Sequence, residues 1–374
     1  MSYLIIILAL ITTIYFCAIV WVIIGFIKIK KIGFQNRETV DEQNISIIIP
    51  VRNEEINIEK CLQSIQNQNY NTSNVEVIII NDHSTDNTEK FVNDFIKGSI
   101  LQISLYALSD KTSKKEALKL GIEKSKYNLI ATTDADCILP ENWLKNTSLH
   151  INDGVDMLLG PIIFEKGNGF LYWFQTLDML AIQGIEFGTL HYQKPILNNA
   201  ANLSYLKSTY KYVGGFDTFN TPSGDDVFLL EKFKSSNKKI TGLLAKDFIV
   251  ETPAEKTLSG FFNQRLRWSS KAKYYSSKLL LFFSSIVLIQ NILLLFICVV
   301  IPLVEKYRLI LIILFLTKWL IDFILLFLVA CFYDRNKALL YFIPVQLIYP
   351  IYIIVVWIAS ITTKYNWKGR EFNG

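Results

Sequence analysis

Acidic side chains stand directly after apolar stretches at two places in this 374-residue chain. Asp82 follows the stretch Val75–Ile80, and Asp134 and Asp136 follow the stretch Leu129–Thr133. Carboxylates at the ends of buried strands can hold a divalent metal together with a sugar nucleotide, because they offer oxygen ligands and hydrogen-bond acceptors. Most of the functional interpretation follows from these acids and from the elements that must position them.

Asp134 and Asp136 are two residues apart. Residues i and i+2 of an extended backbone point the same way, so both carboxylates would face one side. Mg²⁺ and Mn²⁺ prefer oxygen ligands, and Mg²⁺ often shares them with phosphates. The spacing therefore predicts a metal site, with solvated loop acids as the alternative.

A second acidic pair, Asp225 and Asp226, opens a segment with helical character. Adjacent carboxylates raise one another's pKa, which suits a general base that accepts a proton from a hydroxyl. Acids also stabilise the amino end of a helix, and both roles can hold together.

The turn after Ile80 contains Asn81, Asp82, His83, Ser84 and Asp86. Asp82 can accept hydrogen bonds from a base or a ribose. We expect Ser84 or Asp86 to cap the helix that follows, and we interpret His83 as a turn residue rather than a ligand.

Strand-length apolar runs alternate with helical patterns through the middle of the chain. This order predicts a mainly parallel α/β sheet with helices on both faces, which binds ligands beyond the carboxyl ends of its strands. Asn53, Asp82 and Asp134 each lie just past such an end. The expected strands are 45–51, 75–80, 103–108, 129–133, 155–163 and 198–205, and the expected helices are 54–66, 88–96, 114–124, 170–185 and 226–233.

Both ends of the chain contain long apolar runs. Tyr3–Ile27 and Leu279–Leu303 carry no charge, and each is long enough to cross a bilayer as a helix. Two further runs, Leu309–Phe332 and Ala338–Ile361, contain a few charges or prolines. We interpret the first run as a retained anchor rather than a signal peptide, because no cleavage site follows it.

Basic residues flank these runs and predict their orientation. Lys28, Lys30 and Lys31 follow the first run, and Lys271, Lys273 and Lys278 precede the second, so the middle domain is expected in the cytoplasm. These lysines can also contact anionic membrane lipids. Four crossings would place Lys364, Lys368 and Arg370 outside, so either the tail is an exception or one late segment is re-entrant or lies along the surface.

The composition argues against several other classes of protein. The net charge of +5 comes without a basic stripe of interleaved aromatics, so no nucleic acid is expected as a partner. The five cysteines show no paired spacing, and the three histidines are scattered. A disulfide framework and a zinc site are therefore not expected.

Five motifs in order resemble family 2 glycosyltransferases over roughly residues 45–270. They correspond to the first strand and loop, the nucleotide-binding turn, the metal motif, the acceptor-side region and the Q-x-x-R-W signature of the membrane-integral members of that family. The motifs are Ile47-Ile48-Ile49-Pro50-Val51-Arg52-Asn53-Glu54-Glu55, Asn81-Asp82-His83-Ser84-Thr85-Asp86, Asp134-Ala135-Asp136, Gly214-Gly215-Phe216-Asp217 with Gly224-Asp225-Asp226, and Gln264-Arg265-Leu266-Arg267-Trp268.

The resemblance implies a GT-A fold, a Rossmann-like nucleotide-diphospho-sugar transferase domain, flanked here by transmembrane helices. It also implies inversion at the anomeric carbon and a Mg²⁺ or Mn²⁺ cofactor. Asp226 matches the catalytic base, Asp225 is its neighbour, and Asp136 matches the metal ligand. The residues that the resemblance assigns to the nucleotide sugar and its diphosphate are Pro50, Asn53, Glu54, Asp82, Lys114, Asp134, Gln264, Arg267 and Trp268.

Departures from the family pattern concern loop detail. Ser113 stands where a glycine often precedes the lysine, and Ala200 stands where a glycine often begins the acceptor-side strand. Trp268 could instead anchor a helix at the membrane interface, and Arg265 and Arg267 could contact lipid headgroups. Lys318 and Asp322 are four residues apart in an apolar run, and we favour a structural ion pair over an acceptor contact.

The leading hypothesis is a hexosyltransferase-type enzyme of the inner membrane that moves a sugar, expected to be UDP-linked, to a lipid or short glycan acceptor of the cell envelope. A processive polysaccharide synthase is the alternative, and a non-catalytic nucleotide-sugar-binding membrane protein is a distant one. The expected divisions are an anchor (1–31), a cytoplasmic catalytic domain (45–257), an interfacial amphipathic segment (258–278), a transmembrane region of two to three spans (279–362) and a tail (363–374).

Overall fold

A computed structural model describes residues 2–32, 42–109, 112–151, 154–216, 225–271, 275–367 and 370–372. Contacts divide the chain into a helical unit (residues 1–27, 167–192 and 255–374) and a sheet unit (residues 28–166 and 193–254). Residues 167–192, which the sequence assigned to a continuous catalytic domain, belong to the helical unit. Asp217, Gly224, Lys273, Lys368 and the side chain of Asp225 lie outside the described residues.

The sheet unit is built on a mixed sheet in the order β3-β2-β1-β4-β7-β5-β8. The first four strands in this order run parallel to one another, and β7 runs antiparallel to both β4 and β5. The strands are β1 (Ile45–Val51), β2 (Val75–Asn81), β3 (Gln102–Ala107), β4 (Leu129–Thr132), β5 (Met157–Leu159), β7 (Leu203–Leu206) and β8 (Ile240–Gly242).

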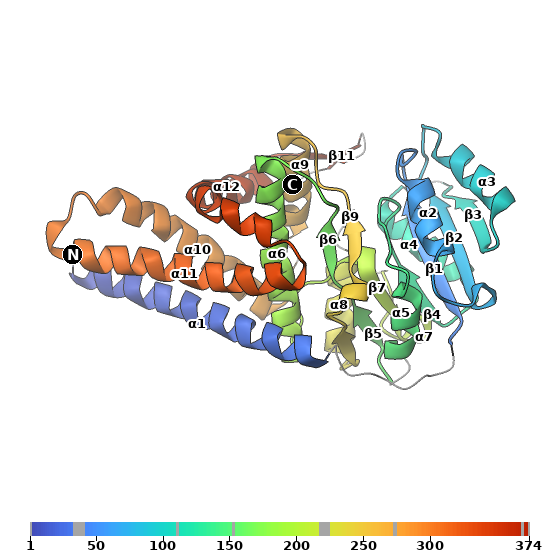
Figure 1. The fold of residues 1–374 in the computed structure, drawn as a ribbon, viewed down its shortest axis with the longest axis horizontal. Helices are drawn as coiled ribbons and strands as arrows, with labels where there is room; N and C mark the ends of the chain where they lie inside the picture. The colour runs from blue at the N-terminus through green and yellow to red at the C-terminus, as the bar shows by residue number, and fades with distance from the viewer. Residues whose placement is uncertain are drawn as a thin grey trace. The chain divides into compact units, whose positions relative to one another are not determined.

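The central strands are isoleucine- and valine-rich because helices cover both of their faces. Right-handed crossovers place α2 and α3 on one face, and the return from β3 to β4 places α4 on the other; Figure 1 shows α2 in front of the strands. Gly121 of α4 meets the sheet closely, since a Cβ there would lie 2.4 Å from Ile48. The helices are α2 (Ile58–Gln66), α3 (Thr88–Gly98), α4 (Lys114–Lys124), α5 (Trp143–Ile151), α7 (Lys207–Tyr212) and α8 (Asp225–Ser235).

Two predicted strands differ from the structure. Residues 155–163 form β5 and a second strand, β6 (Ile162–Phe164), which pairs with β9 (Val250–Thr252). The break falls at Gly160, where a Cβ would lie 2.2 Å from the side chain of Asn202, and at a following proline, which has no N–H for a ladder. The expected strand 198–205 is shorter in the structure. Residues Ala200–Asn202 form a 3₁₀ turn, η2, in which the Asn202 side chain is buried, and β7 starts only at Leu203.

The helical unit contains six helices of eight residues or more among the residues described. By length and apolar composition, four segments could cross a membrane: Ser2–Ile29, Lys278–Val300, Glu305–Phe332 and Asn336–Thr362. The helices are α1 (Ser2–Ile32), α6 (Phe170–Leu190), α9 (Leu258–Ser269), α10 (Lys278–Val300), α11 (Arg308–Phe332) and α12 (Phe342–Thr362).

Helices α1 and α11 run in the same direction, with α10 opposite to them. At one end, Leu8 of α1 packs with Ile297 of α10 and Leu311 of α11. At the other end, α6 passes closely over both helices, because two of its glycines meet Val22 of α1 and Val329 of α11. Small residues allow such close approach between helices in an apolar environment.

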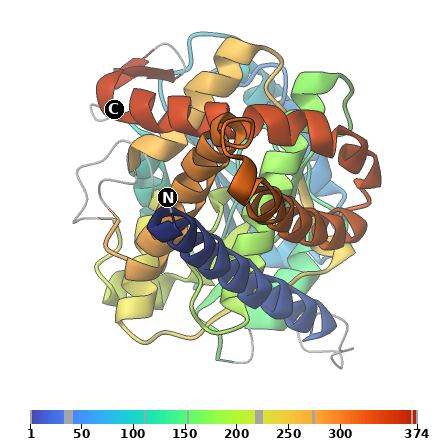
Figure 2. The same ribbon diagram turned by 90° about the vertical axis from the view of Figure 1, so that its left-hand side faces the viewer.

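Helix α12 lies across α10 and α11 rather than alongside them (Figures 1 and 2). Tyr341, just before α12, stacks on Trp173 of α6 at 5.7 Å between ring centroids. The strand β10 (Tyr365–Trp367), which pairs with β11 (Arg370–Phe372) just after α12, contacts α9. The start of α12 therefore lies beside α6, and the segment just after its end lies beside α9.

Candidate functional site

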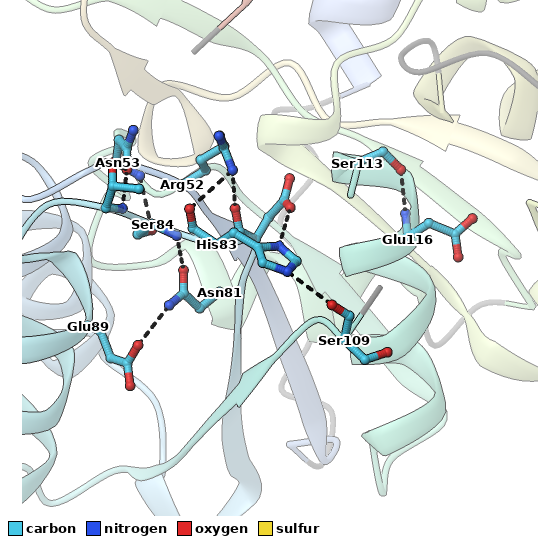
Figure 3. A network of polar contacts seen from close by, with 11 residues as sticks. Arg52, Asn53, Asn81, His83, Ser84, Glu89, Ser109, Ser113 and Glu116 are labelled. Atoms are coloured by element: carbon cyan, nitrogen blue, oxygen red, sulfur yellow. Dashed lines mark hydrogen bonds and ion pairs between the residues drawn. The ribbon is translucent and has the colours of Figure 1, made fainter. Parts of the chain in front are cut away.

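The loops after β1 and β2 are joined by hydrogen bonds that involve backbone and side chains (Figure 3). Arg52 Nη1 donates to the Asp82 carbonyl oxygen at 2.6 Å, and Asn53 Oδ1 accepts from Thr85 N at 2.8 Å. Asn53 adopts a left-handed backbone (φ 51°), which asparagine tolerates better than most residues. The two predicted nucleotide-binding segments therefore form one connected surface.

Pro50 lies within β1, opposite Ile80 of β2. The β4 ladder ends at Thr132, which pairs with Ile48, and the backbone N–H that Pro50 lacks would point toward that side. A proline is tolerated here because it lies at the end of the β1–β4 ladder, where a missing N–H ends the pairing without interrupting it. Pairing between β1 and β4 thus stops below the loops that carry Asn53 and Asp134.

The predicted helix 54–66 starts late, at Ile58, because the preceding residues are held by the β2 loop. Glu54 N donates to Thr88 Oγ1 at 2.7 Å, and Glu55 N donates to Asp86 Oδ2 at 3.1 Å. Glu54 itself is buried, and its Oε2 accepts from Asn57 at 2.9 Å. These contacts fix the loop that starts at the end of β1.

Asp86 lies one residue before Asn87, the N-cap of α3, and its side chain contacts the first helical residue. Its Oδ1 accepts from Thr88 N at 3.0 Å, at the first turn of the helix. Partial burial raises the pKa of the Asp86 carboxyl, but hydrogen bonds from Thr88 and Glu55 outweigh it and leave that pKa below its ordinary value. Ser84 instead accepts from Asn53 N at 3.1 Å, so it serves the junction between the two loops.

Asp82 is buried and sits directly after β2. Its Oδ1 lies 3.2 Å from Nδ1 of His83, whose Nε2 lies 3.1 Å from the carbonyl oxygen of Ser109 (Figure 3). His83 has a left-handed backbone (φ 56°) and links the loops after β2 and β3. This geometry agrees with the interpretation of His83 as a turn residue.

The side chains of Asp134 and Lys114 form an ion pair, with Oδ1 and Nζ 2.5 Å apart. Both remain partly exposed, at 32% and 20%. Lys114 begins α4, and Ser113 caps that helix by accepting from Glu116 N at 3.1 Å. The structure therefore brings together two residues that the sequence assigned separately to the nucleotide.

The extended backbone expected at Asp134 and Asp136 is not observed. Strand β4 ends at Thr132, and Cys137 N donates to the Asp134 carbonyl oxygen at 3.1 Å, which closes a turn. Burial still alternates, since both aspartates are partly exposed while Ala135 is buried. The turn, rather than a strand, is what leaves both carboxylates open to solvent.

Two buried cysteines lie beneath this turn. Cys61 Sγ donates to the Asp134 carbonyl oxygen at 3.6 Å, and Cys137 Sγ donates to Asp136 Oδ1 at 3.6 Å. Burial raises the pKa of the Cys61 thiol, and the charges of Asp136, Asp134 and Glu54 raise it further.

The donor set fits a hard divalent cation bound together with a phosphorylated ligand. Mg²⁺ sites commonly use one or two carboxylates plus substrate phosphates, and Asp134 and Asp136 offer that number at a partly open position. Within the described residues, no group of three or more Asp, Glu, His or Cys side chains could hold a metal alone. A cation here would need oxygen ligands from a bound ligand.

Asp226 lies in the first turn of α8, and its Oδ1 accepts from Val227 N at 2.8 Å. Phe233, near the other end of α8, contacts Tyr205 of β7 at 6.3 Å between ring centroids, and Tyr205 pairs with Ile130 near the start of β4. With a rise of 1.5 Å per residue, Asp226 lies about 10 Å along the helix from that contact.

The direction of α8 follows from the strand after it. Strand β8 runs parallel to β5, and β5 and β4 are both antiparallel to β7, so β8 runs in the direction of β4. Helix α8 ends shortly before β8 starts, and its amino end is therefore directed toward the edge where β4 ends. Asp226 thus lies toward the same edge as Asp82 and Asp134.

Gln264, Arg267 and Trp268 lie on α9 of the helical unit and are partly exposed. Between them, Arg265 is 4% exposed and forms an ion pair with Asp178 of α6, with Nε and Oδ2 2.7 Å apart. Lipid contact, one interpretation of Arg265, is therefore wrong.

Asn202 is a further buried polar residue of the sheet unit that was not among the candidate residues. Its side chain donates to the carbonyl oxygens of Pro161 and Phe248 at 2.9 and 2.8 Å and accepts from Trp143 Nε1 at 2.8 Å. A buried asparagine that uses its donor and acceptor groups in this way joins three separate segments. Its hydrogen bonds therefore stabilise the sheet unit.

Comparison with known proteins assigns the domain. A model of glycosyl transferase family 2 matches residues 46–213. Glycosyltransferase AglE of Haloferax volcanii is 32% identical over 126 residues, covering 33% of this chain and 41% of that protein. Poly-beta-1,6-N-acetyl-D-glucosamine synthase of Staphylococcus epidermidis is 26% identical over 275 residues, covering 68% of this chain and 62% of that protein. The chain thus spans less than two thirds of either curated relative.

Among solved structures, the fold is similar to that of the mannosyltransferase PcManGT from Pyrobaculum calidifontis, determined in complex with GDP-Man and Mn²⁺. The TM-score is 0.57 at 16% identity, and the match covers 96% of this chain and 99% of that one. At this identity the likeness shows the fold alone. Together with the family match, it identifies residues 46–213 as a glycosyltransferase domain of family 2 with the GT-A fold.

Proposed function

We propose that the chain is a membrane-integral, inverting glycosyltransferase that moves a sugar from a nucleoside-diphosphate donor to a lipid or short glycan acceptor. The observation that carries the proposal is the gathering of acids from β2, β4 and the amino end of α8 toward one edge of the sheet. Ligands bind at this edge in doubly wound folds.

On the donor side, Pro50, Asn53, Glu54 and Asp82 border the nucleoside. The hydrogen bonds between the loops after β1 and β2 preorganise this surface, so binding costs little conformational entropy in these loops. Lys114 lies beside Asp134, where its ammonium group attracts phosphate oxygens while the carboxylate contacts the nucleotide sugar.

On the leaving-group side, Asp136 would hold Mg²⁺ or Mn²⁺, which when bound neutralises the charge that grows on the diphosphate. From the resemblance of their motif we assign Gln264 and Arg267 to the diphosphate, to which Arg267 would contribute a permanently charged fork suited to phosphate. Trp268 shapes the acceptor opening. The metal ion and the guanidinium of Arg267 would thus both stabilise the departing nucleoside diphosphate.

Asp226 acts as the general base, with Asp225 as its neighbour. The acceptor hydroxyl loses its proton as its oxygen attacks the anomeric carbon, and the proton passes to a carboxylate oxygen of Asp226. Attack from the side opposite the leaving diphosphate inverts the anomeric centre.

The test is release of nucleoside diphosphate from UDP- and GDP-linked sugars by the purified protein in lipid, with Mg²⁺ or Mn²⁺. Asp226→Asn should lower transfer by about 10²–10⁴-fold while donor binding persists. Glu231→Gln, an acid near the far end of the same helix, is the matched control and should transfer normally. Wild-type transfer by Asp226→Asn would remove this residue as the base.

The acceptor is proposed to be a lipid or short glycan of the cell envelope. An apolar groove of about 390 Å³ between α1 and α10, lined by Trp21, Phe282 and Phe283 among others, would suit hydrocarbon chains of membrane lipids. The similarity to a poly-N-acetylglucosamine synthase favours a second candidate, processive polymer synthesis. Product length on a gel separates them, because a ladder of long polymer contradicts single transfer.

For localisation, we propose a multi-pass protein of the inner membrane with three crossings, by α1, α10 and α11, and with α12 along the cytoplasmic side. Support comes from α12, whose two ends lie beside α6 and α9. Lys364 then stays on the same side as Lys28 and Lys271, which removes the conflict that four crossings create for the charge rule. Modification of a cysteine introduced at Thr363 by a membrane-impermeant maleimide from outside intact cells would contradict it.

A further inference from the structure

We propose that Arg265 and Asp178 are positioning residues whose buried ion pair holds the side chains of Gln264 and Trp268 in place. The proposal rests on the proposed function, in which Gln264 and Trp268 contact the substrates. It adds two residues to that reaction, neither of which needs to touch a substrate.

The ion pair is closed to solvent. Arg265 and Asp178 have side-chain exposures of 4% and 6%, and Arg265 Nε donates to Asp178 Oδ2 at 2.7 Å. Tyr349 of α12 donates to the other carboxylate oxygen at 3.1 Å. The acid is thus held by two helices and has its negative charge matched, as burial of a charge requires.

Nη1 and the face of the Arg265 guanidinium contact two motif residues. Arg265 Nη1 donates to Gln264 Oε1, and the guanidinium carbon lies 4.2 Å from the centre of the Trp268 ring. A further ring, Phe261, lies 4.7 Å away. Phe261, Arg265 and Trp268 are spaced by four and three residues, so they share one face of α9.

Gln264 and Trp268 are partly exposed, unlike Arg265. They are therefore the residues of this cluster that can meet a substrate, while Arg265 and Asp178 act through them. Orientation of side chains within a few tenths of an ångström matters for transfer, and a misplacement of about 1 Å can lower a rate by about a hundredfold.

The chemistry requires arginine at position 265. A planar guanidinium can donate to a carboxylate, donate to an amide oxygen and stack on an aromatic ring at the same time. A lysine ammonium could keep the charge beside Asp178, but it is a point charge that cannot also hold Gln264 and stack on Trp268 in this geometry. Arg265→Lys therefore separates positioning from charge compensation.

The test is a double-mutant cycle of Arg265→Lys and Gln264→Ala on transfer by the protein in lipid. Each single variant should lower kcat by about tenfold to a hundredfold. The loss of kcat in the double variant should be clearly smaller than the product of the two single losses, because Arg265 acts in part through Gln264 and substitutions of residues in contact are not additive.

Two results would overturn the proposal: wild-type kcat for Arg265→Lys, or a double variant whose loss is the product of the two single losses. Thermal unfolding shows whether Arg265→Lys is folded. If it is not, Tyr349→Phe replaces it, since this change removes one hydrogen bond to Asp178 and leaves the ion pair. The same non-additivity with Gln264→Ala is then expected, and additive losses contradict the proposal.

A matched control comes from the same helical unit. Asp322 of α11 is paired with Lys318, with Oδ2 and Nζ 2.8 Å apart. Asp322→Asn also neutralises an acid paired with a buried cation, and its kcat per folded molecule should stay within about twofold of wild type. If Gln264→Ala alone transfers normally, the assignment of Gln264 in the proposed function fails; if it does not, but Arg265→Lys does, only the positioning inference fails.

Discussion

Two ion pairs, one in each unit, show how the same chemical groups serve different ends. Asp134 and Lys114 in the sheet unit are 32% and 20% exposed, whereas Asp178 and Arg265 in the helical unit are 6% and 4% exposed. An open pair costs little to separate, because water and ions screen it. A closed pair is expensive to break, because the remaining charge stays buried.

The exposure difference predicts opposite consequences for function and stability. The acids of the sheet unit can exchange partners with a ligand, while the acid of the helical unit cannot do so without unfolding its surroundings. Removal of an acid from the two pairs should therefore differ: loss of the Asp178 charge mainly lowers stability, whereas loss of the Asp134 charge mainly lowers activity.

The largest effect on activity is expected from Asp136→Asn. Transfer should fall by at least about a hundredfold, because a metal ligand at the leaving group is lost. Stability should change by less than about 0.5 kcal/mol, since the side chain is partly exposed. Removal of divalent cations with EDTA should have the same effect on the wild type. Transfer that persists after either change would show that the open acids do not serve a metal.

The largest effect on stability is expected from Asp178→Asn. Loss of the charge that compensates buried Arg265 should lower the free energy of unfolding by about 3–5 kcal/mol. Thermal unfolding in detergent measures it, with Asp134→Asn as the open counterpart, for which a change of about 1 kcal/mol or less is expected. Equal destabilisation by both variants would remove the distinction between the two pairs.

A smaller effect is expected from Lys114→Met. The KM for the nucleotide sugar should rise by about tenfold to a hundredfold, as expected for loss of a hydrogen bond from a charged group worth about 1.5–3 kcal/mol. The free energy of unfolding should hardly change. Steady-state kinetics at varied donor concentration measure the KM, and an unchanged KM would place Lys114 outside the donor site.

The smallest effect is expected from Asp86→Asn, which weakens the cap of α3 by about 1 kcal/mol or less. The folded-state pKa of Asp86 lies below its ordinary value of 3.8, so the carboxylate stabilises the fold above that value and loses this effect as the pH falls through the folded pKa. The difference in unfolding free energy between wild type and variant should shrink below about pH 4. A constant difference from pH 7 to pH 3 would contradict the cap assignment.

The buried strands were predictable because both of their faces are covered. Ile45–Val51 and helix Lys114–Lys124 have the predicted bounds, since a continuous apolar run and a helical spacing each leave one interpretation. The prediction of one continuous strand over residues 155–163 was wrong, because a close contact with Asn202, about forty residues later in the chain, interrupts the strand at Gly160.

The candidate site was predictable where residues follow strand ends, as for Asp82 and Asp134. It was not predictable where partners meet across long separations. Arg265 and Asp178 are 87 residues apart in the chain, and neither local spacing nor composition indicates that they pair. The prediction of extended backbone at Asp134 and Asp136 was also wrong, because a hydrogen-bonded turn can expose alternate side chains just as a strand does.

The central claim is that carboxylates distant in the sequence surround one sugar nucleotide. Isothermal titration of UDP- and GDP-linked sugars with Mn²⁺, combined with transfer assays on Asp82→Asn, Asp136→Asn and Asp226→Asn, tests it most directly. The account predicts that the first two variants lose donor binding and that Asp226→Asn binds donor but does not transfer the sugar. Donor binding at wild-type strength by Asp136→Asn, together with wild-type transfer by Asp226→Asn, would contradict it.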